Sequence, residues 1–235
     1  GGIATPRGAA NFQGTTDMGL VPDLLPGGLP VSDATARESL ERIWQGRWAG
    51  HVATSDGYVQ RKELPSEPGI GMDGLVEAIE SGTVKAMWVE GGPRTRTFFP
   101  NPRLFEALQK LEFLVVADSF DSPLASIADV LLPVSTGLEK DGTFTSFDRT
   151  VQRVRAAVPA LGESRSILEY LADIAAYFGY QLEYGHPSHV MREIASVVPG
   201  YNGISYAFLE RGGIVTPVGG PGADGVQVLD STSGL

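Results

Sequence analysis

The fold class is decided by residues 84–93, which read VKAMWVEGGP. A largely apolar run, residues 84–89, leads directly into Glu90-Gly91-Gly92-Pro93, and an amphipathic segment follows near residues 102–110. Further apolar runs lie at residues 113–116 and 130–132. Continuous apolar strands that alternate with helices are typical of a parallel sheet that helices cover on both faces. The sequence therefore predicts an α/β fold with a mostly parallel, Rossmann-like sheet.

The carboxyl ends of these strands hold the first candidate binding residues. Right-handed crossovers bring Gly91, Gly92, Asp118 and the segment after Pro133 to one edge of the sheet, where ligands bind in such folds. A carboxylate there can accept the ring N–H and the exocyclic amino group of guanine together, so Asp118 is a guanine-binding candidate. Capping of the next turn explains Asp118 equally well. Gly91 and Gly92 would let a phosphate approach the backbone, or would simply form a tight turn.

Outside this region the chain divides into three parts. Residues 1–31 are dense in Gly and Pro and are expected to form an irregular segment that lines a cleft. In this segment Arg7 could hold a small carboxylate by paired hydrogen bonds, although a lone arginine is usually just solvated. Residues 32–210 are expected to form the α/β domain, and residues 211–235 a Gly/Pro-rich tail. Further helices are predicted at 32–46, where Asp33 would be the cap, at 75–79, which Ser81-Gly82 would end, and at 166–178, 187–197 and 205–211.

The composition excludes several classes of function. A net charge of -10 without a basic cluster argues against binding to nucleic acid. The apolar runs are far too short to insert into a membrane, and we expect a cytoplasmic protein. With no cysteine in 235 residues, the chain has no thiolate for an iron-sulfur cluster or a soft metal. His186 and His189 lack a third ligand nearby, so no metal site is predicted.

Three stretches together resemble the molybdopterin oxidoreductase family, and the catalytic subunits of formate dehydrogenases most closely. The first is Arg7-Gly8-Ala9-Ala10-Asn11-Phe12-Gln13-Gly14, followed by Asp17-Met18-Gly19 and Leu25-Pro26-Gly27. The second is Ala128-Asp129-Val130-Leu131-Leu132-Pro133, then Glu139-Lys140-Asp141-Gly142-Thr143-Phe144-Thr145 and Arg149 with Val151-Gln152-Arg153. The third, which is weaker, is Pro199-Gly200-Tyr201-Asn202-Gly203-Ile204-Ser205-Tyr206 with Gly212-Gly213 after it. Their order matches the family over nearly the whole chain.

The resemblance implies a cleft in which two molybdopterin guanine dinucleotides (bis-MGD) chelate one molybdenum or tungsten atom. The iron-sulfur domain and a C-terminal barrel would lie outside this chain, which we therefore expect to be an internal piece that is inactive when isolated. The implied partners are those remaining domains or subunits, including iron-sulfur electron-transfer subunits, and a small anionic substrate such as formate. Attachment to a membrane complex through partner subunits stays open, and so does a periplasmic location.

The resemblance also implies roles for individual residues. Arg7 matches the arginine that is thought to orient formate beside the metal, and Asp118 matches the carboxylate that binds the guanine of one pterin dinucleotide. Ser122 falls where the family commonly has a threonine that touches the same nucleotide. The turn from Glu139 to Gly142 falls where the backbone closes over the pterin.

Three departures from the family pattern favour an alternative function. Ala9 replaces a glutamine, Glu90-Gly91-Gly92-Pro93 replaces Gly-Glu-Asn-Pro or Gly-Glu-Asp-Pro, and Ser122-Pro123-Leu124 replaces Thr-Glu-Thr. Such changes fit a chain that keeps the fold without the cofactor, as in the large iron-sulfur subunit of NADH-quinone oxidoreductase (complex I). A free-standing guanine nucleotide binder is a third alternative, disfavoured because nothing coordinates magnesium or surrounds a triphosphate.

Overall fold

The computed structural model describes residues 9–45, 52–54, 57–59, 63–91, 102–178, 182, 184–216 and 227–228. The chain forms two compact units, each built from separate stretches of sequence. We call Gly69–Lys140 with Ala156–Tyr170 the parallel-sheet unit. We call Gly1–Pro68 with Asp141–Arg155 and Leu171–Leu235 the antiparallel-sheet unit.

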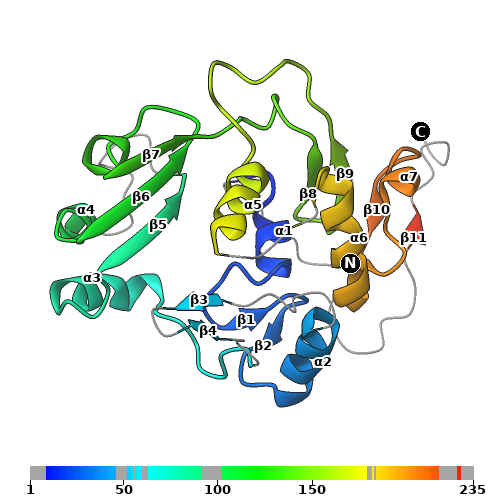
Figure 1. The fold of residues 1–235 in the computed structure, drawn as a ribbon. Coiled ribbons are helices and arrows are strands. Elements are labelled where there is room, and N and C mark those ends of the chain that lie inside the picture. The colour runs from blue at the N-terminus through cyan, green and yellow to red at the C-terminus, as the bar shows by residue number, and fades with distance from the viewer. Residues whose placement is uncertain are drawn as a thin grey trace. The chain divides into compact units, whose positions relative to one another are not determined.

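The parallel-sheet unit confirms the predicted α/β class. Its strands are β5 (Ala86–Glu90), β6 (Phe113–Asp118) and β7 (Val130–Pro133), and they pair in that order, all parallel (Figure 1). Helix α3 (Met72–Glu80) precedes β5, α4 (Pro102–Leu108) connects β5 to β6, and the short η2 helix (Ala125–Ile127) connects β6 to β7. The three strands lie at the apolar runs of the sequence, and α3 ends at Ser81-Gly82 as predicted.

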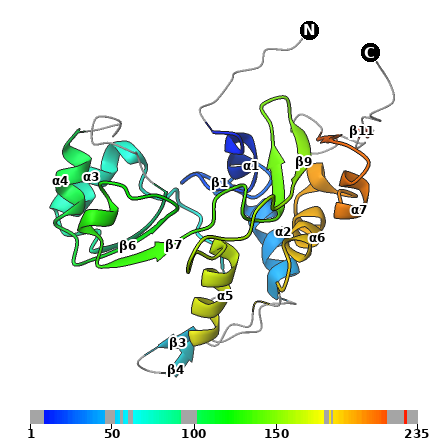
Figure 2. The same ribbon diagram turned by 90° about the horizontal axis from the view of Figure 1, so that it is seen from above.

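One face of this sheet carries the core of the unit. Leu114 and Val116 of β6 are fully buried against Val76 of α3, Leu104 of α4 and Leu124. Figure 2 shows α3 and α4 on the same side of β6. Burial of each large aliphatic side chain contributes about 1.5–3 kcal/mol, so this layer holds the strands in register. The opposite face was expected to be covered as well. Among the described residues α3 and α4 pack on the same face, and the other face leaves Trp88, Phe113 and Val130 exposed.

The antiparallel-sheet unit contains a second sheet that the sequence reasoning did not foresee. Strands β8 (Gly142–Thr145), β9 (Thr150–Val154), β10 (Ile214–Val215) and β11 (Gln227–Val228) pair antiparallel in the order β11-β10-β9-β8. Two of these strands have only two residues, too few for an alternating pattern to be recognised. In the core of this unit, Val151 and Ile214 of the sheet pack against Met191, Tyr201 and Leu209.

The helices of this unit agree with the predictions. Helix α2 (Ala34–Gln45) begins after Asp33, whose carboxylate accepts the Ala36 N–H at 3.1 Å as a cap. Helices α6 (Pro187–Val197) and α7 (Tyr206–Leu209) flank η3 (Pro199–Tyr201), and β3 (Val52–Thr54) pairs with β4 (Gly57–Val59). Helix α5 (Ile167–Tyr177) contains the boundary between the two units. No helix in the described part of the chain is both long and apolar enough to cross a membrane.

The N-terminal segment is less irregular than predicted. It contains α1 (Phe12–Asp17) and a hairpin of β1 (Leu24–Leu25) with β2 (Leu29–Pro30). Gly27 and Gly28 form the hairpin turn with positive φ angles of 95° and 72°, which glycine tolerates without steric cost. Helix α1 is too short to be stable by its own propensity, so contacts with distant residues must hold it.

Candidate functional site

The carboxyl edge of the parallel sheet brings together three of the predicted site residues. Strand β5 ends just before Gly91, and β6 ends at Asp118. The Gly91 N–H donates to the Ala117 carbonyl at 2.7 Å, and the Val134 N–H donates to the Asp118 carbonyl at 3.0 Å. Backbone hydrogen bonds therefore fix the ends of all three strands relative to one another.

The side chain of Asp118 has one paired and one unpaired oxygen. Oδ1 accepts the Phe120 N–H at 3.2 Å, which is the turn-capping role that the sequence also allowed. Oδ2 is buried and has no hydrogen-bond partner among the described residues. A buried acceptor without a partner costs about 1–3 kcal/mol, and more when it is charged. The cap therefore uses only half of this carboxylate and leaves an acceptor that a ligand donor could satisfy.

Ser122 and Gly91 lie beside Asp118 in different local roles. Ser122 is 6% exposed, and its Oγ accepts the Ala125 N–H at 3.4 Å at the start of η2. Gly91 has a φ of +70°, and a Cβ added there would meet no atom of the described residues within 4 Å. The surface at Gly91 is thus open, although its N–H is already used by Ala117. Gly92 and Arg7 lie outside the described residues.

Glu139 and Gly142 are not part of this edge cluster. The Glu139 carboxylate accepts the Thr136 N–H at 2.7 Å and the Leu161 N–H at 3.2 Å. These hydrogen bonds, led by that from Thr136, hold the pKa of Glu139 below its ordinary value. The Glu139 side chain therefore closes the turn at Thr136 and binds the backbone at Leu161 to it. Gly142 begins β8 and belongs to the antiparallel-sheet unit.

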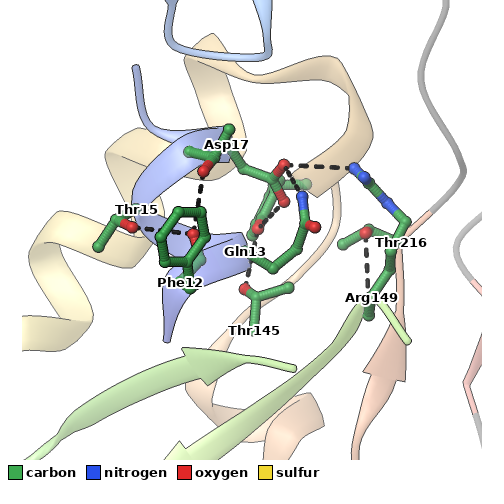
Figure 3. Close-up of polar contacts among 9 residues, drawn as sticks. Phe12, Gln13, Thr15, Asp17, Thr145, Arg149 and Thr216 are labelled. Atoms are coloured by element: carbon green, nitrogen blue, oxygen red, sulfur yellow. Dashed lines mark hydrogen bonds and ion pairs between the residues drawn. The ribbon is translucent and has the colours of Figure 1, made fainter. Parts of the chain in front are cut away.

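A buried polar cluster around α1 was missed by the sequence reasoning, and Figure 3 shows its main contacts. Asp17 is 7% exposed and accepts the Tyr201 hydroxyl at 2.9 Å and the Gln13 amide at 2.7 Å. The Tyr201 hydroxyl also lies 2.9 Å from the Thr145 hydroxyl. Because Tyr201 gives its only proton to Asp17, Thr145 must donate to Tyr201. Burial, and to a smaller extent the charge of Asp17, raises the pKa of Tyr201, so the phenol stays protonated as a donor.

Arg149 joins the same cluster from the turn between β8 and β9. Its Nη2 lies 3.5 Å from Asp17 Oδ1, and its carbonyl accepts both the N–H and the hydroxyl of Thr216, at 3.0 Å and 3.2 Å (Figure 3). Arg149 has a φ of 69°, in the left-handed region that a residue with a side chain rarely adopts. No local pattern could have revealed a pair that is separated by 132 residues.

His186 has a structural role in this unit. Its Nδ1 accepts the Ser188 N–H at 3.1 Å and caps α6, so this nitrogen carries no proton. Among the described residues, no group of three or more His, Asp or Glu side chains is placed to hold a metal ion.

Comparison with known proteins gives consistent family matches. Residues 10–177 match the model of the family described as molybdopterin oxidoreductase. Two Bacillus subtilis proteins, provisionally named oxidoreductase YjgC and formate dehydrogenase YrhE, are 36% and 35% identical over 93% and 87% of this chain. A Staphylococcus haemolyticus protein, provisionally named formate dehydrogenase SH0748, is 36% identical over 87% of the chain. The chain spans 19% to 21% of the length of these relatives. Acetylene hydratase from Pelobacter acetylenicus aligns with 61% of the chain, and the chain covers 20% of it, at 15% identity and a TM-score of 0.48.

Proposed function

The chain belongs to the molybdopterin oxidoreductase family, and from this membership we propose that it supplies one nucleotide-binding lobe of a bis-MGD site in a formate dehydrogenase-like enzyme. The molybdopterin cofactor carries molybdenum or tungsten and is shared with domains outside this chain. The chain spans about a fifth of the length of its relatives, and we propose that the reaction needs the full-length protein and that the isolated chain is inactive.

The single observation that carries the proposal is the unpaired oxygen of Asp118. It lies at the carboxyl edge of a parallel sheet, where ligands of such folds bind. Guanine presents two adjacent N–H donors, and a carboxylate can accept both. The orphaned Oδ2 fits a donor of this kind, since binding would supply the partner that the described residues do not provide. Gly91, which follows β5, and Ser122, which follows β6, belong to the same edge of the sheet.

The proposal extends to the other parts of the predicted site. In this proposal the segment 1–31 would line the substrate cleft, residues 32–210 would bind the nucleotide, and residues 211–235, which include β10 and β11, would lead towards a C-terminal barrel. The guanidinium of Arg7 would hold the formate carboxylate by paired hydrogen bonds. The metal centre, when bound, supplies the two-electron oxidation of formate to carbon dioxide, and electrons leave through iron-sulfur partners. Glu139 and Gly142 lie three positions apart along the chain, where its backbone would close over the pterin.

Replacement of Asp118 in the full-length protein tests the nucleotide lobe. Two hydrogen bonds to a charged acceptor contribute about 3 kcal/mol or more, so Asp118→Ala should weaken retention of the cofactor by about 10²-fold or more. We expect guanine nucleotide, released by acid and measured by chromatography, to be lost from the variant during incubation and to stay in the wild type. Asp121→Ala in the same exposed turn is the matched control. Full guanine retention in Asp118→Ala would rule out the proposed contact.

One observation favours the cofactor-free scaffold as a second candidate. The Gly91 N–H is already bonded to Ala117, so it cannot donate to a phosphate without breaking that bond. A scaffold of the complex I type would need no phosphate contact at this turn. Measurement of bound metal and guanine nucleotide distinguishes the two candidates, because the scaffold would contain neither.

A further inference from the structure

One face of the parallel sheet is apolar and uncovered in the described part of the chain. Alternate residues of a strand point to opposite faces, so the sequence neighbours of the buried Leu114 and Val116 share the other face. We call it the Trp88 face, and by the strand register its residues are Ala86, Trp88, Glu90, Phe113, Val115, Ala117, Val130 and Leu132. Trp88, Phe113 and Val130 are 36%, 46% and 38% exposed. Apart from Glu90 the face is entirely apolar, so covering it with another apolar surface is favourable.

The outer edge of β5 is open as well among the described residues. The strand order β5-β6-β7 places β5 at one edge of the sheet (Figure 1), whereas just beyond β7 the chain returns to pair Arg165 with Val134. Exposed edges are normally protected by a proline, a bulge or an edge charge. β5 reads Ala-Met-Trp-Val-Glu and contains no such device before its last residue, Glu90. The sequence of β5 is therefore that of an inner strand.

The backbone of β5 shows which groups a further strand would meet. The Gly91 N–H and the Lys85 carbonyl both form hydrogen bonds with β6. Because the direction of these groups alternates along a parallel strand, every second residue between them faces away from β6. The outward residues are Ala86, Trp88 and Glu90. A strand that pairs with the outer edge would use their N–H and carbonyl groups.

The handedness of the crossovers determines what can cover the Trp88 face. The chain runs from β5 to β6 to β7 in one direction, and α4 and the segment of η2 pack on the face that carries the core. Right-handed crossovers in one direction all place their helices on one face, and crossovers in the opposite direction place them on the other. A helix on the Trp88 face therefore needs a crossover that starts from a strand beyond β5. The open edge and the uncovered face indicate the same missing element.

We propose that a strand and a helix from the part of the full-length protein outside this chain complete the parallel sheet. The strand pairs in parallel with the outer edge of β5, and the apolar side of the helix covers the Trp88 face. The relatives have the length for such an element, because this chain spans only 19% to 21% of them. The addition also brings three strands closer to the mean of about five to six strands in a sheet. This interface does not depend on a bound cofactor, so both candidate functions are compatible with it.

Photo-crosslinking in the full-length protein tests what covers the face. Phe113→p-benzoylphenylalanine replaces one exposed aromatic side chain with another that reacts with nearby C–H bonds under light. Mass spectrometry should find a cross-link, within one molecule, to a peptide outside residues 1–235. Glu106→p-benzoylphenylalanine on the exposed side of α4 is the matched control and should not label that peptide. Cross-links only to residues 1–235, cross-links only between two molecules, or no cross-link would each overturn the proposal.

Residue-resolved hydrogen exchange of the full-length protein tests the strand at the edge. The outward amides of Trp88 and Glu90 should exchange at least about 10²-fold more slowly than in an unstructured chain. Ala86→Pro removes an outward N–H and leaves the hydrogen bonds to β6 in place, so these two amides should lose about tenfold or more of their protection while β6 keeps its own. Ala86→Val keeps the N–H and is the matched control. Unprotected amides in the wild type, or unchanged exchange in Ala86→Pro, would overturn the added strand.

Discussion

Asp118→Asn should change stability and cofactor binding in opposite directions. Asparagine keeps Oδ1 as the acceptor for the Phe120 N–H and replaces the unpaired, charged Oδ2 with a neutral amide nitrogen. A buried polar group without a partner costs about 1–3 kcal/mol, and more when charged. Because Asp118 is only half-buried, we take the lower end of this range. The amide nitrogen is also unpaired there, so Asp118→Asn removes only the added cost of the charge, and the cofactor-free protein should gain about 1 kcal/mol of local stability.

The assay is hydrogen exchange of the full-length protein in its cofactor-free form. A gain of about 1 kcal/mol corresponds to roughly fivefold slower exchange, since 1.4 kcal/mol is a factor of ten. The effect should be confined to peptides from residues 113–128 and absent in Asp121→Asn. In the cofactor-loaded protein the same Asp118→Asn variant should lose guanine, because its amide N–H₂ opposes a guanine donor. Equal or faster exchange in the cofactor-free variant would refute the reasoning about Oδ2.

Three further predictions concern other parts of the chain. Arg7→Ala should lower formate turnover by about 10²-fold with nearly unchanged cofactor content, and equal activity would exclude its role. Tyr201→Phe leaves Asp17 Oδ2 and the Thr145 hydroxyl unpaired, so exchange in α1 and β8 should accelerate by an amount equivalent to about 1–3 kcal/mol; unchanged exchange would contradict the buried cluster. The lowered pKa of Glu139 means that its carboxylate stabilises the turn above its ordinary value of 4.5 and loses this effect as the pH falls below that value. Exchange at Thr136 and Leu161 should accordingly be faster in Glu139→Gln than in wild type at neutral pH, and the difference should vanish in acid. A difference that does not depend on pH would exclude this charge effect.

The elements that could be predicted are those whose signals are local. The apolar runs of β5, β6 and β7, the Asp33 cap of α2 and the Ser81-Gly82 stop of α3 are each contained in a few neighbouring residues. The shared carboxyl edge of these strands could be predicted from the runs, because the handedness of the crossovers leaves little choice of topology. Gly91, Asp118 and Ser122 lie at this edge, as the sequence suggested.

The elements that could not be predicted depend on contacts between distant residues. Helix α1 is held through Asn11, Asp17 and Thr145, and the strand β10 pairs with β9 across more than fifty residues. The capping role of Glu139 was also hidden, because Leu161 lies 22 residues away. Trp88 of the parallel sheet is exposed, which shows that an apolar strand sequence alone does not determine which face of the sheet a helix covers.

The most direct test of the account is the content of molybdenum, tungsten and guanine in the native full-length protein. Mass spectrometry of the metals and chromatography of the acid-released nucleotide give both values on one sample. A protein with a bis-MGD site should contain about one molybdenum or tungsten atom with two guanine nucleotides per molecule. Absence of both metals and of guanine, with iron still present, would contradict it and support the scaffold.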